Sequence, residues 1–240
     1  METYSKDTII SLGRSKGLEI LNEIKNAKKE VKIISPYLSP DYIKELIYLN
    51  NKGVDITLIT CDKLETNQWS DFKPSDIIRE EKIEDIKLRS LKKSLYSISM
   101  ILFLSSIMSF PIMFFYKGLL FIPAVLLFIS LILFGTRFII QDYKYNYHSI
   151  FRLKVFDSKS GINPQSTNLI HSKIFLIDNK ILFLGSANFT YSGFKTHYET
   201  IVKVEDEIAI NKISDEVGSL FNSGFLKSKD IQEWGKERYE

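Results

Sequence analysis

Two long stretches without a charged side chain constrain this chain more than any other feature. Ser94–Tyr116 holds 23 consecutive uncharged residues and Gly118–Thr136 holds 19, and both are rich in Ile, Leu, Met and Phe. A helix needs about 20 mostly apolar residues to cross a bilayer. Each stretch therefore predicts a transmembrane helix, at about 94–116 and 118–140, and the lone Lys117 between them predicts a hairpin.

The alternative is a pair of buried helices in a soluble core. Core helices normally keep one polar face, and two successive helices without one are rare. Pro111 and Pro123 would interrupt soluble helices, whereas membrane helices tolerate proline when neighbouring groups satisfy the freed carbonyls. The membrane hairpin is therefore the preferred interpretation.

Basic residues flank the two stretches on their outer sides. They are Lys82, Lys87, Arg89, Lys92 and Lys93 before the first stretch and Arg137, Lys144, Arg152 and Lys154 after the second. Only Lys117 marks the turn between the stretches. Because Lys and Arg are enriched on the cytoplasmic side of membrane helices, we expect both termini and the rest of the chain to face the cytoplasm.

Composition limits what the remaining residues can form. The chain has 240 residues and is 45% hydrophobic, which suffices for one sizeable core. The 32 basic and 29 acidic residues give a net charge of +3, which does not indicate a polyanionic partner. Cys61 is the only cysteine, so an intrachain disulfide is excluded and a thiolate metal cluster is implausible. No cofactor is expected.

Outside the hairpin, strand patterns and helix patterns alternate. Helices are predicted at Leu18–Lys29, Pro40–Asn51 and Glu207–Phe221, and strands at Val31–Ser35, Val54–Thr60, Leu153–Phe156, Ile170–Ile177, Ile181–Leu184 and Glu199–Val204. The short Asp178-Asn179-Lys180 segment predicts a tight connection between two of these strands. The predicted fold class is α/β, a mixed β-sheet flanked by helices.

Neither half of the chain has enough predicted strands to bury a core alone. We therefore expect one discontinuous domain formed by residues 1–62 and 150–240. Residues 63–149 would form an insertion that carries the hairpin.

One short region carries candidate chemistry. His171 and Lys173 are two residues apart, so on a strand they would share one face. Asp178 follows after four residues, and Ser186 and Asn188 lie in a Gly-Ser-x-Asn turn that begins after six more. Neutral imidazole can attack phosphorus and leaves readily once protonated. A lysine ammonium and an amide can stabilise charge that develops on phosphate oxygens, and no metal is needed.

Each of these residues alone has an ordinary structural explanation. A lone His at the edge of a strand is more often structural than catalytic, and Lys173 could be a solvated charge. Asp178 stands in a tight turn, where Asp is favoured for local reasons. The ordered combination is far more specific than its parts.

That combination resembles the H-x-K-x4-D-x6-G-S-x-N signature of the phospholipase D superfamily, and every named position is matched. The similarity extends to Pro36-Tyr37 after the first predicted strand, to the Lys52-Gly53-Val54 turn, and to Glu199 on the last strand. The resemblance implies a metal-independent phosphodiesterase with a phospholipase D-like fold. Only the hairpin departs from the usual pattern.

The resemblance also implies a role for each matched residue. His171 would be the nucleophile, or the general acid in the partner subunit. Lys173, Asn188 and Ser186 would bind the substrate phosphate. Asp178 would brace the turn between the motif strands, and Glu199 would hydrogen-bond to His171 and fix its tautomer.

A complete site of this superfamily has two such motifs, and this chain has one. His148 and His197 lack a lysine two residues later. We therefore expect a homodimer with an isologous interface, in which each subunit contributes one half-site. The implied mechanism is a two-step displacement through a phosphohistidine.

The substrate stays open between two classes. A bilayer anchor would place the site at a phospholipid surface, and basic residues such as Lys92, Lys93 and Arg137 would attract anionic head groups, which slightly favours phospholipid. The same residues would attract DNA or RNA, so a membrane-tethered nuclease is the alternative. A third reading is a non-catalytic, phosphate-binding membrane scaffold, which the intact motif argues against.

Overall fold

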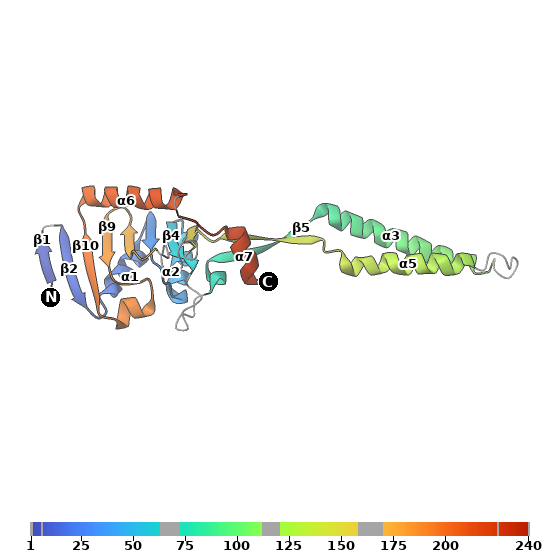
Figure 1. The fold of residues 1–240 in the computed structure, drawn as a ribbon, viewed down its shortest axis with the longest axis horizontal. Helices are drawn as coiled ribbons and strands as arrows, with labels where there is room; N and C mark the ends of the chain where they lie inside the picture. The colour runs from blue at the N-terminus through green and yellow to red at the C-terminus, as the bar shows by residue number, and fades with distance from the viewer. Residues whose placement is uncertain are drawn as a thin grey trace. The chain divides into compact units, whose positions relative to one another are not determined.

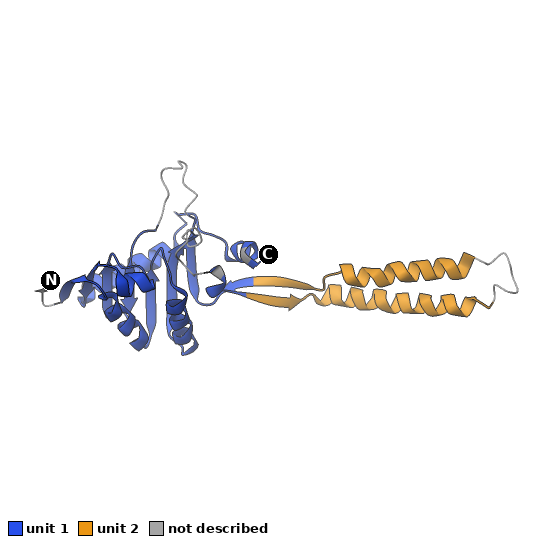
Figure 2. Ribbon diagram, turned by 90° about the horizontal axis from the view of Figure 1, so that it is seen from below, with its two compact units in different colours: residues 1–79, 147–240 blue, residues 80–146 orange. Residues whose placement is uncertain are grey.

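The computed structural model describes residues 2–5, 7–62, 73–111, 121–157, 170–224 and 226–239. The chain divides into two compact units (Figure 2). Unit 1 combines Met1–Arg79 with Tyr147–Glu240, and unit 2 is the intervening segment Glu80–Asn146.

In the described residues, unit 1 is built on an eight-stranded sheet with the order β1-β2-β10-β9-β8-β3-β4-β7. Its strands are β1 (Glu2–Ser5), β2 (Thr8–Gly13), β3 (Glu30–Ile34), β4 (Asp55–Cys61), β7 (Arg152–Phe156), β8 (Ile174–Ile177), β9 (Ile181–Gly185) and β10 (Glu199–Val204). The pairs β3–β4 and β4–β7 are parallel, and the other neighbours are antiparallel. The mixed sheet expected from the sequence is therefore confirmed.

The parallel pair β3–β4 is connected by helix α2 (Pro40–Asn51). The β-branched residues of β3 are buried, which fits a central strand covered on both faces. Pro40 stands in the first turn of α2, where its fixed φ suits a helix start. Gly53 has a φ of +89°, a conformation that glycine adopts without strain, and it turns the chain into β4.

Helices cover both faces of the sheet. Helices α1 (Gly17–Asn26) and α2 lie on one face and α6 (Glu207–Asn222) on the other (Figure 1). Strand β8 shows the alternation, because Phe175 and Ile177 belong to the core under α1 and α2, whereas Leu176 packs with Ile210 of α6. Helix α7 (Ile231–Tyr239) adds the fully buried Trp234 to the first core.

The hairpin β8–β9 has a tight turn, as the sequence predicts. Asp178 and Asn179 have φ values of +53° and +50°, and the Lys180 N–H donates to the Ile177 carbonyl at 2.9 Å. Two successive residues with positive φ define a type I′ turn, which matches the twist of antiparallel strands and favours Asp and Asn.

Unit 2 contains two long helices, α3 (Ile86–Ser109) and α5 (Phe121–Ile139). They run antiparallel, because Ser106 donates to the Pro123 carbonyl at 2.8 Å and Ser130 donates to the Ser99 carbonyl at 2.9 Å. These serines are buried, and small residues between membrane helices allow close packing. A two-stranded sheet of β5 (Ile78–Glu84) and β6 (Tyr143–Ser149) flanks the pair in sequence.

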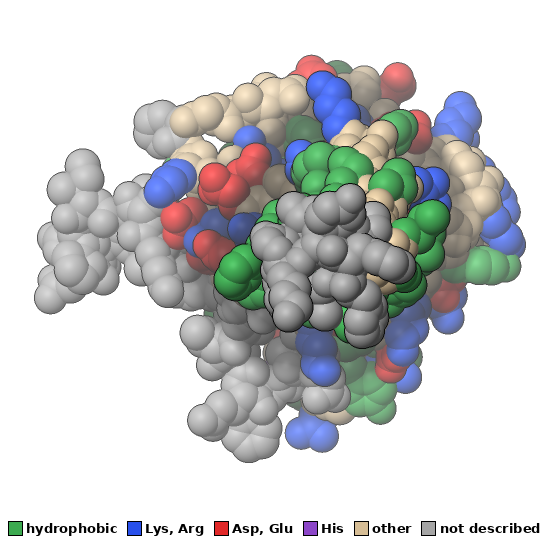
Figure 3. Space-filling view, turned by 90° about the vertical axis from the view of Figure 1, so that its right-hand side faces the viewer, with side chains coloured by type: hydrophobic (Ala, Val, Ile, Leu, Met, Phe, Trp, Pro, Cys, Tyr) green, Lys and Arg blue, Asp and Glu red, His purple; other side chains and the backbone are tan. Residues whose placement is uncertain are grey.

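Both long helices meet the length and composition needed to cross a membrane, with mean hydropathies of 1.2 and 2.2. Only 11% of each apolar window is buried within the chain. Many large hydrophobic side chains of the two helices are therefore exposed. Figure 3 shows a group of hydrophobic side chains, in green, on the surface near the centre of its view. Helix α3 starts at Ile86, earlier than the span expected at about 94–116, and the expected turn at Lys117 lies outside the described residues.

Candidate active site

Three neighbouring strands bring the matched motif residues to one edge of the sheet. Strand β8 is antiparallel to β3, so the residues before β8 lie beside the C-terminal end of β3. Strands β9 and β10 alternate in direction again, with Ile174 opposite Leu184 and Ile201 opposite Gly185. His171 and Lys173, Ser186 and Asn188, and Glu199 therefore converge at this edge, which we call the motif edge.

Gly185 allows β9 and β10 to approach closely at the motif edge. A Cβ atom at this position would lie 2.1 Å from the Thr200 carbonyl oxygen, which no side chain could tolerate. The close approach lets the Ser186 N–H donate to the same carbonyl at 3.0 Å. The first residue of the Gly-Ser-x-Asn turn is thus required by backbone packing.

Ser186 and Glu199 form the centre of the site. The Ser186 hydroxyl accepts the Thr200 N–H at 3.1 Å and donates its proton to the Glu199 carboxylate. Glu199 is only 7% exposed, and its other carboxylate oxygen lies 3.7 Å from His197 Nδ1. In the described residues Glu199 thus contacts Ser186 and His197, and its expected bond to His171 stays a prediction.

His171 and Lys173 lie against each other just before β8. The Lys173 Nζ is 3.0 Å from His171 Nδ1 and 3.2 Å from Nε2, and it donates to the His171 carbonyl at 2.7 Å. The expected strand over Ile170–Ile177 begins only at Ile174, so strand alternation does not account for this contact. Instead, the Lys173 side chain folds back along the chain, so that its Nζ reaches the His171 ring and carbonyl oxygen.

The two side chains differ in their exposure to solvent. The His171 side chain is exposed, whereas Lys173 is only 7% exposed. Burial lowers the pKa of the Lys173 ammonium below its usual range, and the Glu199 carboxylate opposes that shift only in part. The site thus combines an accessible imidazole with a desolvated amine that an anionic ligand would help to keep charged.

Asn188 is held in place by the segment that follows β3. The Ser35 hydroxyl accepts the Phe189 N–H at 2.9 Å, and the Ser39 hydroxyl accepts the Tyr191 N–H at 2.9 Å. The Asn188 side-chain oxygen is buried and has no hydrogen-bond partner among the described residues. A buried polar atom left unpaired is costly, and such groups often await a ligand.

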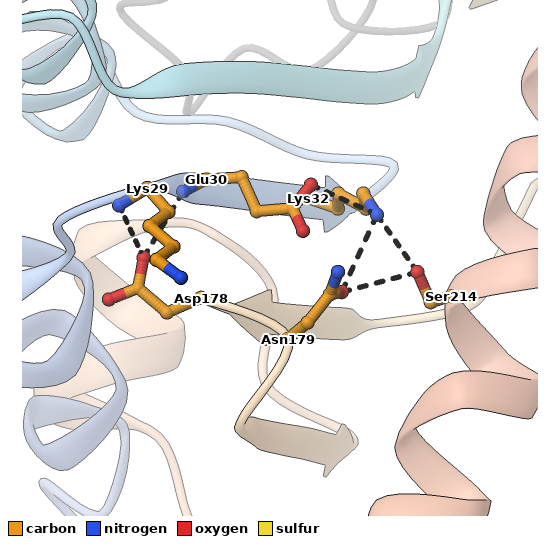
Figure 4. A network of polar contacts seen from close by, with 6 residues as sticks. All are labelled: Lys29, Glu30, Lys32, Asp178, Asn179 and Ser214. Carbon is orange, nitrogen blue, oxygen red and sulfur yellow. Dashed lines mark hydrogen bonds and ion pairs between the residues drawn. The ribbon is translucent and has the colours of Figure 1, made fainter.

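Asp178 lies at the other end of β8 and has a different environment. Its carboxylate accepts the backbone N–H groups of Lys28, Lys29 and Glu30 at distances between 2.7 and 3.1 Å. Figure 4 shows the contacts with Lys29 and Glu30. Burial alone would raise the pKa of this carboxyl, but the three backbone donors outweigh burial and the pKa lies below its ordinary value. Asp178 therefore braces the turn before β3.

Three contact residues were not among those expected from the sequence. Ser35 precedes Pro36 and Ser39 follows it, in the segment after strand β3. Serine is a common turn residue after a strand, so nothing in the neighbouring sequence indicates that these two serines contact a distant loop. His197 is two residues before Glu199, and this spacing could have indicated a pair on one face.

Chemically, the motif edge offers an exposed imidazole, a buried amine and an amide oxygen without a hydrogen-bond partner among the described residues. This set suits a phosphodiester, whose non-bridging oxygens need cationic and hydrogen-bonding partners. The described residues contain no group of three or more His, Cys, Asp and Glu side chains that could hold a metal ion. His171 is the one histidine of the sequence that has a lysine two residues later.

Comparison with known proteins identifies similar sequences and folds. A family model described as the PLD-like domain of cardiolipin synthase matches residues 20–104 and 133–223. NucT from Helicobacter pylori is 16% identical, with 92% of this chain and 98% of NucT covered and a TM-score of 0.48. Nuc from Salmonella typhimurium, a phospholipase D family member, is 13% identical, with 93% and 99% covered and a TM-score of 0.45.

A third solved structure, phosphatidylserine synthase from Haemophilus influenzae Rd KW20, is 13% identical. The match covers 97% of this chain and 42% of the synthase, with a TM-score of 0.44. No curated protein matches the chain significantly. The family model leaves out residues 105–132, which fall within unit 2.

Proposed function

This chain belongs to the PLD-like phosphodiesterase family, and from that membership we propose that it is a membrane-anchored phosphodiesterase that needs no metal ion. The observation that carries the proposal is the contact between the exposed His171 and the buried Lys173, 3.0 Å apart, at the edge where Asn188 has an unpaired amide oxygen. These groups supply a nucleophile and two stabilising partners for a phosphoryl group.

The proposed reaction has two displacement steps. In the first, a neutral His171 imidazole nitrogen forms a bond to phosphorus while the bond to the leaving oxygen breaks, and a second histidine protonates that oxygen. In the second step, the second histidine takes a proton from water. The water oxygen then forms a bond to phosphorus while the bond between phosphorus and the His171 nitrogen breaks. Lys173 and Asn188 would bind the non-bridging oxygens throughout both steps.

A second imidazole must come from another subunit, because one chain carries one motif. His197 contacts Glu199, but no lysine follows it at motif spacing. We therefore propose a homodimer in which His171 of both subunits serves one shared site. Ser186 and Glu199 would act by positioning, since the hydroxyl proton of Ser186 is already donated to the carboxylate.

We further propose that α3 and α5 span a membrane with both termini and unit 1 in the cytoplasm. Basic residues at the outer ends of the two helices support this orientation. A cysteine in place of Lys117 should react with an impermeant thiol reagent applied from outside the cell. Native Cys61 is fully buried and gives little background, whereas labelling of Ser5→Cys but not Lys117→Cys would contradict the orientation.

We propose phospholipid head-group hydrolysis as the first candidate reaction, because a membrane anchor concentrates the site near lipid. Cleavage of nucleic acid is the second candidate, because its phosphodiester groups offer His171 the same chemistry and basic residues attract it.

The decisive experiment offers all substrate classes to the detergent-solubilised protein in EDTA. Single-stranded and duplex DNA, RNA, phosphatidylglycerol and cardiolipin are incubated with wild-type protein and with His171→Asn as control. We expect hydrolysis of phospholipid by the wild type alone. Nucleic-acid cleavage without lipid hydrolysis would reverse the substrate order. Binding without turnover of any substrate would indicate a scaffold, and activity restored only by a divalent ion would refute metal independence.

A further inference from the structure

Unit 2 contains a charged cavity that the proposed reaction does not use. It has a volume of about 520 Å³ and lies where the first turns of α3 meet the last turn of α5. Its basic lining consists of Arg89, Lys92, Lys93 and Arg137. The cavity therefore concentrates positive charge at one end of the apolar helix pair.

The spacing of the lining residues explains how the cavity forms. Arg89, Lys92, Lys93 and Tyr96 follow one another at i, i+3, i+4 and i+7, which places them on one face of α3. Antiparallel packing of α5 brings Arg137 to the same end, and its guanidinium lies 5.2 Å from the Tyr96 ring centroid. Four cations, the Asp142 carboxylate and the rings of Tyr96 and Phe138 thus line one space.

Only part of this positive charge is neutralised by the chain itself. Arg89 pairs with Glu84, and Lys92 pairs with Asp142 at 2.8 Å. The hydrogen bond from Lys92 lowers the pKa of the Asp142 carboxyl, so this pair stays ionised. Lys93 and Arg137 have no carboxylate partner among the residues described, and the cavity retains a positive excess that calls for an anion.

The surroundings identify what kind of anion fits. Directly beyond the cavity, the helices expose apolar side chains, with Met100 38% and Ile101 63% exposed. Tyr96 and Phe138 line the cavity, and aromatic residues are typical of the membrane–water interface. A free phosphate or a nucleic acid would use the cations but leave this apolar surface uncovered. A phospholipid uses both, with its phosphate in the cavity and its acyl chains along the helices.

We propose that this cavity is a binding site for the head group of an anionic glycerophospholipid, with Lys93 and Arg137 as the principal phosphate ligands. The inference rests on the membrane-spanning role proposed above for α3 and α5, but not on the catalytic activity. The bound lipid is a fixed ligand of the anchor and is distinct from any substrate at His171.

The test measures lipid binding to the full chain in detergent micelles by native mass spectrometry. Phosphatidylglycerol and zwitterionic phosphatidylcholine are titrated against wild type, Lys93→Gln/Arg137→Gln and the control Lys87→Gln. Lys87 is an exposed lysine in the first turn of α3 that does not line the cavity. Inorganic phosphate and a single-stranded oligonucleotide, added as competitors, distinguish a lipid site from a general anion site.

We expect the wild type and Lys87→Gln to prefer phosphatidylglycerol, and the double variant to lose roughly 30-fold in affinity for it. Equal losses for the double variant and Lys87→Gln would show diffuse attraction and overturn the proposal. Competition by the oligonucleotide at equal charge concentration would overturn it in favour of a nucleic-acid site.

Alkaline extraction of membranes before the binding assay tests the membrane anchor separately from the lipid site. Protein that is released by alkaline extraction would refute the membrane anchor together with the lipid site. Protein that stays in the membrane but shows no lipid preference would refute the lipid site alone. The outcome for catalysis is read separately, from the nucleic-acid and lipid turnover assays in EDTA.

Discussion

Members of the same motif lie at both ends of strand β8, but the hydrogen bonding of their polar groups differs between the two ends. At the Asp178 end, one carboxylate satisfies three backbone N–H groups, and Lys32 contacts Glu30, Asn179 and Ser214 (Figure 4). At the motif edge, Asn188 has an unpaired buried oxygen and Lys173 is buried beside a single imidazole.

This difference separates residues that hold the fold from residues that await a ligand. A fully paired polar network lowers the free energy of the folded chain, whereas an unpaired buried group raises it and is kept only where it has a use. The contrast predicts that substitutions at the motif edge change turnover without loss of stability. Substitutions at the Asp178 end should change stability without loss of turnover.

The largest effect is expected for His171→Asn in every chain. Both the nucleophile and the general acid disappear, so turnover should fall by about 10,000-fold or more. The side chain is exposed, so the free energy of unfolding should change by less than about 0.5 kcal/mol. Steady-state turnover and urea unfolding check both statements. Retained activity within tenfold of wild type would remove His171 from the mechanism.

Mixed dimers test whether the motif edge of one chain is complete by itself. A heterodimer of wild-type and His171→Asn chains has one histidine in a shared site, so it should be as inactive as the double variant or stall as a phosphohistidine. Purification through two different tags and a single-turnover assay measure this. Half of the wild-type rate would mean that each subunit has its own complete site.

Asn188→Ala sharpens the comparison because its two readouts should move in different directions. Loss of one phosphate donor typically lowers the rate by about 100 to 1,000-fold. Removal of the unpaired oxygen should leave the free energy of unfolding unchanged or raise it by up to about 1 kcal/mol. Lys173→Ala should lose activity to a similar extent. A large loss of stability in Asn188→Ala would instead give Asn188 a structural role.

The sequence predicted the family of this chain better than the geometry of the motif edge. Residue types at fixed spacing, such as His171 and Lys173, indicate the family whatever the backbone does between them. Their contact was expected from strand alternation, yet β8 begins after both, and the lysine reaches the histidine by folding back. Such side-chain paths depend on loops, which periodicity does not describe.

Long-range contacts were the other part that the sequence could not predict. Ser35 and Ser39 clamp the loop that holds Asn188, across more than 150 positions in sequence, and neither residue type indicates such a partner. Strands β1 and β2 were not predicted either, because β2 exposes Ile10 and Leu12 and lacks a clear polar face. Strands β3 and β4, which are apolar and bounded by Pro36 and Gly53, were predicted to within one residue at each end.

The smallest effect is expected at the other end of β8. Asp178→Asn keeps a residue that tolerates the positive φ of +53° and keeps one acceptor, so it should lower the free energy of unfolding by about 1 kcal/mol. Asp178→Ala loses every acceptor and adds backbone strain, for a loss of about 2 to 3 kcal/mol. The carboxylate is partly exposed, and solvent screening keeps these effects modest.

The pH dependence of this difference identifies its cause. The pKa of Asp178 is lower in the folded chain than in the unfolded chain, where it is about 3.9. The stabilisation by the charged form is therefore complete above that unfolded value and is lost as the pH falls through the folded pKa. Wild type and Asp178→Asn should differ in stability at pH 7 and converge as the pH falls below the folded pKa of Asp178. Urea unfolding followed by fluorescence of the buried Trp234 measures the difference.

Turnover at pH 7 and 25 °C, where both proteins are folded, should be equal, because Asp178 lies a strand's length from His171. A gap in stability that persists at low pH would assign the effect to turn geometry, and a loss of turnover in the folded variant would place Asp178 in the active site after all.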